Sequence, residues 1–192
     1  MSDTPPAIMI TIRPYKSSDK AALLEIFEAN LREEWGKYHQ GQYIKNAERY
    51  ILSVTDDAES DLHNIRRVYL EPGGSFWVLV VLAPCPEGNN DNDDTVIGMV
   101  GLQILPDRQE GEIRRNCILP AYRGQGWGTK MCKQAQELAH QKGLKRVFCS
   151  TPEHGEDVLR FYKNKLGFTE FGERQEMHGT PIKEVFLEWY VK

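Results

Sequence analysis

The sequence predicts an α/β domain with a mixed sheet, because strand-like and helix-like patterns alternate along its 192 residues. Short apolar runs rich in β-branched residues indicate strands, and apolar residues at helical spacing indicate amphipathic helices. The length fits one domain at roughly 100–200 residues per domain, and no repeat or interdomain linker divides residues 1–192. The predicted order is a strand, two helices, three strands, a helix, a strand, a helix and two strands.

The first third of the chain predicts one strand and two helices. Residues 1–7 are polar and proline-containing, so we expect them to be flexible, and the first strand follows at residues 8–12. Ser17, Ser18 and Asp19 offer N-cap oxygens to a helix over residues 19–28. A second helix is predicted over residues 43–54, where the apolar side chains share one face.

The remainder of the chain predicts most of the sheet and two further helices. Gly98 and Gly101 interrupt a strand, where they indicate bulges or close backbone approaches. Gly143 and Gly167 stand where helix C-caps belong. We predict strands at residues 76–82, 96–105, 112–119, 146–150, 168–171 and 183–191, helices at 128–142 and 156–166, and an exposed hairpin loop at 84–95.

Composition narrows the class of protein. The net charge of −4 and pI of about 5.8 argue against nucleic-acid binding, which favours a basic surface. No pair among Cys85, Cys117, Cys132 and Cys149 has CxxC spacing, so we predict neither a metal site nor a redox dithiol. The beginning of the chain shows no signal-peptide pattern, and no apolar run is long enough for a membrane span. The sequence therefore predicts a cytoplasmic protein without membrane association.

A glycine-rich stretch between a predicted strand and a predicted helix is the strongest candidate for a binding site. It consists of Arg123, Gly124, Gln125, Gly126, Trp127, Gly128 and Thr129. Helix N-termini carry unpaired N–H groups and partial positive charge, which together bind phosphate. Glycines let the backbone approach a pyrophosphate closely, and Arg123 adds a charged donor. The alternative is a tight turn that needs glycine for geometry alone. The stretch fits neither the P-loop nor the GxGxxG pattern.

The segment from Arg123 to Gly128 resembles the Q/R-x-x-G-x-G/A signature of the GNAT acetyltransferases, and residues 159–168 resemble the same family's FYxKxGF segment. The resemblance implies a mostly antiparallel central sheet with helices on both faces and strands splayed at the cofactor site. It also implies acetyl-CoA as co-substrate, with its pyrophosphate on residues 123–129. The pantetheine arm would then lie along the main chain of Asn116, Cys117 and Ile118.

The resemblance implies two catalytic residues as well. Tyr162 would be the general acid that protonates the leaving thiolate, and Glu112 the general base that takes a proton from the amine. Alternatively, Tyr162 only packs on the sheet, and Glu112 ends a strand on the solvent side. Many relatives use a chain of waters in place of a direct base.

The acceptor site is less well specified. In relatives it is framed in part by the segment between the first two helices, which here contains Glu34, Trp35 and Tyr38. Arg66 and Arg67 are the alternative, for an anionic acceptor. We expect a small or amino-acid-like primary amine as acceptor. Protein lysine or N-terminal acetylation and a non-catalytic acyl-CoA-binding module are the alternatives, and a homodimer is compatible with the family.

Overall fold

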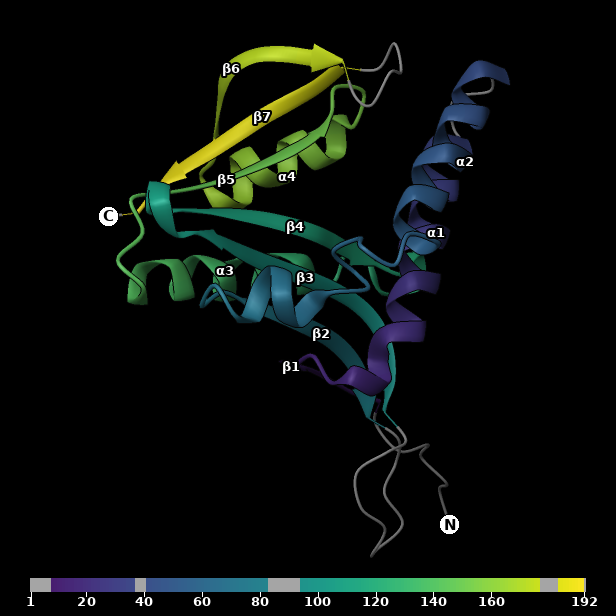
Figure 1. The fold of residues 1–192 in the computed structure, drawn as a ribbon, viewed down its shortest axis with the longest axis horizontal. Coiled ribbons are helices and arrows are strands. Elements are labelled where there is room, and N and C mark those ends of the chain that lie inside the picture. The colour runs from purple at the N-terminus through teal and green to yellow at the C-terminus, as the bar shows by residue number, and fades with distance from the viewer. Residues whose placement is uncertain (1–7, 37–40, 83–93, 177–182, 192) are drawn as a thin grey trace, which may run out of the picture.

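The computed structural model describes residues 8–36, 41–82, 94–176 and 183–191. The strands among them form one seven-stranded sheet (Figure 1). The strand order is β1-β2-β3-β4-β5-β7-β6, and every neighbouring pair is antiparallel except β4 and β5. The strands are β1 (Met9–Pro14), β2 (Ser75–Leu82), β3 (Thr95–Leu105), β4 (Glu110–Ile118), β5 (Arg146–Pro152), β6 (Thr169–Glu176) and β7 (Lys183–Tyr190). The helices are α1 (Lys20–Gly36), α2 (Gly41–Thr55), α3 (Trp127–Gln141) and α4 (Glu156–Leu166), with a π-helical turn η2 (Arg66–Leu70).

Helices cover both faces of this sheet. Buried side chains of α1, α2 and η2 form one core with β2 and β3, and buried side chains of α3 and α4 form a second core on the opposite face. β2 and β3 therefore send alternate side chains into the two cores. The mixed, mostly antiparallel fold with helices on both faces is confirmed.

The sheet opens between its two parallel strands. Residues 110–112 of β4 pair with residues 146–148 of β5, and beyond this point the two strands separate (Figure 1). β4 continues against β3, and β5 continues against β7. The register of β3 and β4 shifts between Met99 and Gly101, opposite Arg115, whose φ of 56° lies in the left-handed region. A bulge of this kind bends a strand and redirects its main-chain groups.

Several element boundaries differ from the prediction. Helix α1 continues to Gly36 and carries an Asn30 side chain bonded to the Ile26 carbonyl and an Arg32–Glu28 pair. The turn η2 and most of β6 were not predicted. Most of the 84–95 hairpin lies outside the described residues. None of the described helices is long and apolar enough to span a membrane.

Gly98 closely approaches the backbone of β4, and Gly101 closely approaches the aromatic side chains of Tyr69 and Phe76. A Cβ atom on Gly101 would lie 2.5 Å from Cε1 of Tyr69, and one on Gly98 would lie 3.0 Å from the carbonyl oxygen of Cys117. The two glycines thus let η2 and the bulged part of β4 pack tightly against β3.

Candidate functional site

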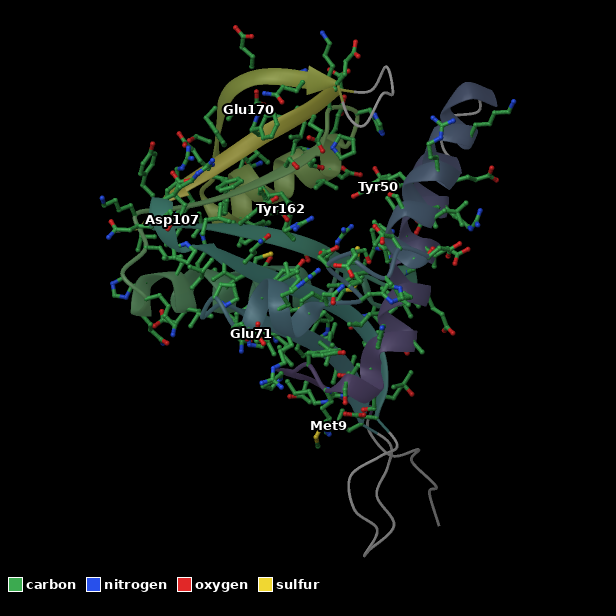
Figure 2. The ribbon with its side chains drawn as sticks, viewed as in Figure 1. Met9, Tyr50, Glu71, Asp107, Tyr162 and Glu170 are labelled. Atoms are coloured by element: carbon green, nitrogen blue, oxygen red, sulfur yellow. The ribbon has the colours of Figure 1, made fainter. Side chains whose placement is uncertain are left out.

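A pocket of about 400 Å³ lies at the opening between β4 and β5. Side chains from α1, α2, β4, β5, α4 and β7 line it. Four residues predicted to be functional come together there: Glu112, Asn116, Cys117 and Tyr162. Figure 2 shows Tyr162 on α4 and Tyr50 on α2, on opposite sides of this opening. The pocket thus joins the two faces of the sheet at the point where the strands separate.

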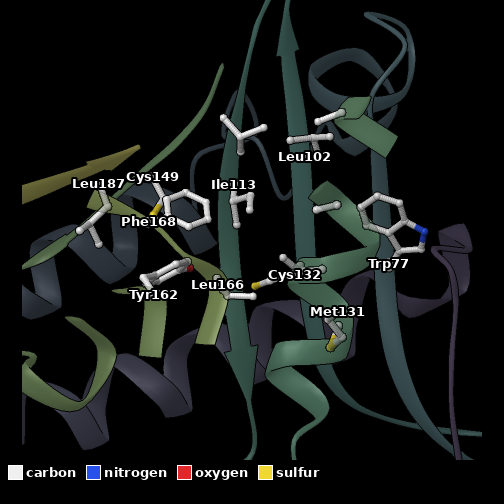
Figure 3. Packing of buried hydrophobic residues seen from close by; sticks show 14 of the residues in the cluster. Trp77, Leu102, Ile113, Met131, Cys132, Cys149, Tyr162, Leu166, Phe168 and Leu187 are labelled. Carbon is white, nitrogen blue, oxygen red and sulfur yellow. The ribbon is translucent and has the colours of Figure 1, made fainter. Parts of the chain in front are cut away.

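Tyr162 occupies the side of the pocket that faces α4. Its ring packs beside Phe168 in the core (Figure 3). Its hydroxyl accepts a hydrogen bond from Nδ2 of Asn116 at 3.3 Å. Burial raises the pKa of Tyr162 well above its usual value, and the neighbouring Cys149 adds to the shift. Tyr162 therefore keeps its proton at neutral pH and is able to donate it.

Glu112 lies on β4 where pairing with β5 ends. Burial raises the pKa of this carboxyl, and the negative charges of Asp61 and Glu184 raise it further, whereas Arg114 and Arg115 lower it. A raised pKa makes a carboxylate a stronger base than an exposed glutamate. Glu112 therefore has the chemistry expected of a proton acceptor.

A buried ion pair supports the bulge of β4. Arg115 donates from Nε to Oδ2 of Asp61 at 2.9 Å and from Nη2 to Oδ1 at 2.6 Å. The hydroxyl of Tyr69 donates a short hydrogen bond to the same carboxylate, and the guanidinium lies 4.6 Å from the centre of the Phe27 ring. Sequence reasoning missed this cluster, because 54 residues separate Asp61 from Arg115 and neither belongs to a motif.

The bulge that Arg115 holds is followed directly by Asn116, Cys117 and Ile118, the residues predicted to align the pantetheine arm. The Asp61 pair therefore positions the main chain of this segment through the Arg115 side chain.

The glycine-rich stretch leads directly into the N-terminus of α3. Gly124 and Gly126 have φ values of 75° and 83°, which favour glycine strongly. A Cβ atom at either position would meet no other atom within 4 Å, so this part of the turn is open to a ligand. Gly128 faces the ring of Phe161 on α4, which a Cβ would approach to 3.5 Å. The turn thus combines an open backbone with a helix N-terminus, the arrangement that binds phosphate.

The side chain of Arg123 points away from this open turn. Its Nε donates to the carbonyl oxygen of Ile118 at 2.8 Å, and its Nη2 donates to Oδ1 of Asn30 at 2.7 Å. An ion pair with Glu33 at 2.8 Å completes the contacts with α1. In this structure Arg123 therefore ties the loop to α1 through most of its guanidinium donors.

The family model for the acetyltransferase (GNAT) family matches residues 21–168. That match spans more than half of the chain, including the pocket-forming β4 and α4. The chain belongs to the GNAT family. The resemblance seen in the two sequence motifs is thereby confirmed.

Curated relatives of this GNAT chain match it over part of their length. An uncharacterized N-acetyltransferase of Escherichia coli, YjgM, is 27% identical over 113 residues, which cover 58% of this chain and 60% of the relative. The N-acetylaspartate synthetase of Danio rerio is 26% identical over 147 residues, which cover 73% of this chain and 48% of the relative. The GNAT chain therefore spans about half to three fifths of these proteins.

Solved GNAT structures share the whole fold. An acetyltransferase of the GNAT family from Staphylococcus aureus superposes with a TM-score of 0.70 at 21% identity, covering 96% of this chain and all of the other. The PaiA N-acetyltransferase of Thermoplasma acidophilum, solved in complex with coenzyme A, has a TM-score of 0.67 at 19% identity, covering 95% and 99% of the two chains. At these identities the likeness establishes the fold.

The acceptor residues predicted for this GNAT chain are only partly described. Glu34 is half-buried on α1 and is not among the residues that line the pocket. Tyr38 and the side chain of Trp35 lie outside the described residues. Arg66 and Arg67 are exposed, pair with Glu71 and Glu59, and lie outside the pocket. Among the described residues, no cluster of His, Cys, Asp and Glu side chains is arranged to hold a metal ion.

Proposed function

We propose that this GNAT domain transfers the acetyl group of acetyl-CoA to the primary amine of a small molecule by direct attack. The observation that carries the proposal is the pocket itself. It brings a proton-accepting carboxyl, Glu112, and a tyrosine that keeps its proton, Tyr162, to the opening between β4 and β5. The open turn at Gly124 and Gly126 fits the pyrophosphate of the co-substrate.

Acetyl-CoA supplies a thioester whose carbonyl carbon the amine attacks. Most primary amines are protonated at neutral pH, so Glu112, directly or through a water, first takes a proton from the bound ammonium. A main-chain N–H of residues 116–118 faces the carbonyl oxygen, where such a donor contributes about 2.7–4 kcal/mol to transition-state stabilisation. Tyr162 donates its proton to the leaving sulfur and regains one from the acetylated nitrogen. Glu112 returns its proton to solvent.

The cysteines near the site support direct attack over an acyl-enzyme. Burial raises the pKa of the Cys117 thiol to about 11 and that of Cys132 to about 12. Burial also raises the pKa of Cys149 well above its usual range. Because the thiolate is the nucleophilic form, these groups are poorly suited to accept the acetyl group themselves.

The size of the pocket supports a small acceptor. Its volume of about 400 Å³ falls within the range of small-molecule sites, roughly 300–1,000 Å³. Phe27 and Leu31 of α1 and Tyr50 of α2 line the side of it that we assign to the acceptor. A protein lysine or N-terminus needs a more open groove, and short peptides in the acceptor panel test that alternative.

The experiment is a thiol-release assay with acetyl-CoA and a panel of small amines, amino acids and peptides, measured against pH. We expect activity to be lost as pH falls through the raised pKa of Glu112, because only the ionised carboxylate accepts a proton. Glu112→Gln should lower kcat by about 10²–10⁴-fold and remove this part of the pH profile.

Glu48→Gln, a matched change on the exposed face of α2, should leave both the rate and the profile unchanged. If the pH dependence of activity in Glu112→Gln matches that of the unaltered protein, a chain of waters and not Glu112 acts as the base. Binding of CoA in calorimetry without thiol release from any acceptor would identify a non-catalytic acyl-CoA-binding module.

A further inference from the structure

Arg114 and Arg115 are neighbours on β4, but only the charge of Arg115 is neutralised by hydrogen bonds to a carboxylate. Arg115 has an 8% exposed side chain and is neutralised by the two hydrogen bonds to Asp61. Arg114 is 31% exposed and donates from Nη1 to Oε1 of Gln103 at 3.0 Å. Its nearest carboxylates, those of Glu112 and Asp61, lie at 3.9 and 4.0 Å, too far for hydrogen bonds. A guanidinium has five N–H donors, so Arg114 has donors left for a ligand.

Arg114 and Glu112 present opposite charges to the same pocket. They are two residues apart on one strand before the bulge, so their side chains leave the same face of the sheet. The separation of 3.9 Å between Nε of Arg114 and Oε1 of Glu112 places the two groups side by side. Glu184 adds a second carboxylate to the pocket wall.

This arrangement discriminates between kinds of amine. A simple amine whose ammonium group reaches Glu112 meets the positive charge of Arg114 beside it. An acceptor with a carboxylate next to its amine instead satisfies both groups, because a guanidinium binds a carboxylate with two parallel hydrogen bonds.

We infer that the acceptor is an α-amino acid or a similar amine with an adjacent carboxylate, and that Arg114 binds this carboxylate and determines specificity. The inference rests on the proposed acetyl transfer and names its substrate class. Phe27, Leu31 and Phe186 provide an apolar wall for the remainder of the acceptor.

The test compares amino acids with their carboxamides and with the corresponding decarboxylated amines, using apolar, acidic and basic side chains. We expect kcat/KM for the best amino acid to exceed that of its two uncharged counterparts by at least about tenfold, the effect of 1.4 kcal/mol. Arg114→Gln should reduce this preference about tenfold, chiefly by raising KM for the amino acid, and Arg114→Lys should restore part of it. Arg66→Gln, 85% exposed and outside the pocket, should leave the preference unchanged.

Equal turnover of acid and carboxamide by the unaltered protein would overturn the inference while leaving acetyl transfer intact. An unchanged preference in a folded Arg114→Gln variant would overturn the role of Arg114.

A binding experiment separates this inference from the proposed acetyl transfer. NMR measures the binding of each amino acid and of its uncharged counterparts to the CoA-loaded protein. If amino acids bind in a way that depends on their carboxylate and on Arg114 but release no thiol, acetyl transfer is overturned and the carboxylate site is retained. Absence of both binding and turnover for the amino acids would overturn the inference as well.

Discussion

The regions assigned to coenzyme A and to the acceptor are constructed differently. The region assigned to coenzyme A is one continuous stretch, residues 116–129, which touches the pocket at Asn116 and Cys117 and continues into the open glycine turn beyond it. The region assigned to the acceptor collects charged and aromatic side chains from α1, α2, β4 and β7. A main-chain site keeps its chemistry when side chains change, whereas an acceptor site made of side chains can be altered one residue at a time. The comparison explains how one fold can serve different acceptors with one co-substrate.

The largest expected effect is on kcat and comes from Tyr162, which lies between the coenzyme A and acceptor regions. Tyr162→Phe removes the proton donor and should lower kcat by about 10²–10⁴-fold. Because the proton goes to the leaving sulfur, the loss should be similar for every acceptor, and calorimetric CoA affinity should hardly change. Tyr190→Phe, at a 59% exposed position, is the matched control. Full activity in a folded Tyr162→Phe protein would remove Tyr162 from the mechanism.

A second prediction concerns the buried ion pair that supports the bulge of β4. Asp61→Ala leaves the buried Arg115 guanidinium without its partner, and breaking such a pair typically costs about 3–5 kcal/mol. Urea unfolding should show this loss of stability. Asp107→Ala, at an exposed position (Figure 2), should change stability by less than about 0.5 kcal/mol. A cost below about 1 kcal/mol for Asp61→Ala would mean that the pair does not hold the bulge.

The smallest effect is expected in the coenzyme A region. Alanine at Gly126 must adopt φ near 83°, which costs roughly 1–2 kcal/mol. Since no atom lies within 4 Å of the added Cβ, the cost is conformational, and relaxation of the turn should weaken CoA binding about tenfold. Acceptor preference should be unaffected. Gly36→Ala on α1, which also meets no atom within 4 Å, is the control. Unchanged CoA affinity in Gly126→Ala would contradict the phosphate role of the turn.

The bounds of an element were predicted accurately where its sequence pattern lies within the element itself. Helix α4 was predicted with its observed bounds, because its helical spacing and the glycine at its C-terminus are contiguous. β6 was predicted too short, since it is an edge strand with mostly exposed polar residues and shows little apolar alternation. The π-helical turn η2 was missed because Tyr69 is held there by packing against Gly101 and by Asp61, whose other partner is the distant Arg115.

The sequence by itself determined the order of strands and helices, the glycine-rich turn and the position of Tyr162 on its helix. Only the tertiary structure decided that Arg123 contacts α1, that Arg115 is neutralised, and that Arg114 keeps donors facing the pocket. The Arg123–Glu33 contact spans 90 residues and the Arg115–Asp61 pair spans 54. Periodicity and turn chemistry are short-range properties of the chain. The partner of a charged side chain is set by which distant segments the sheet brings together.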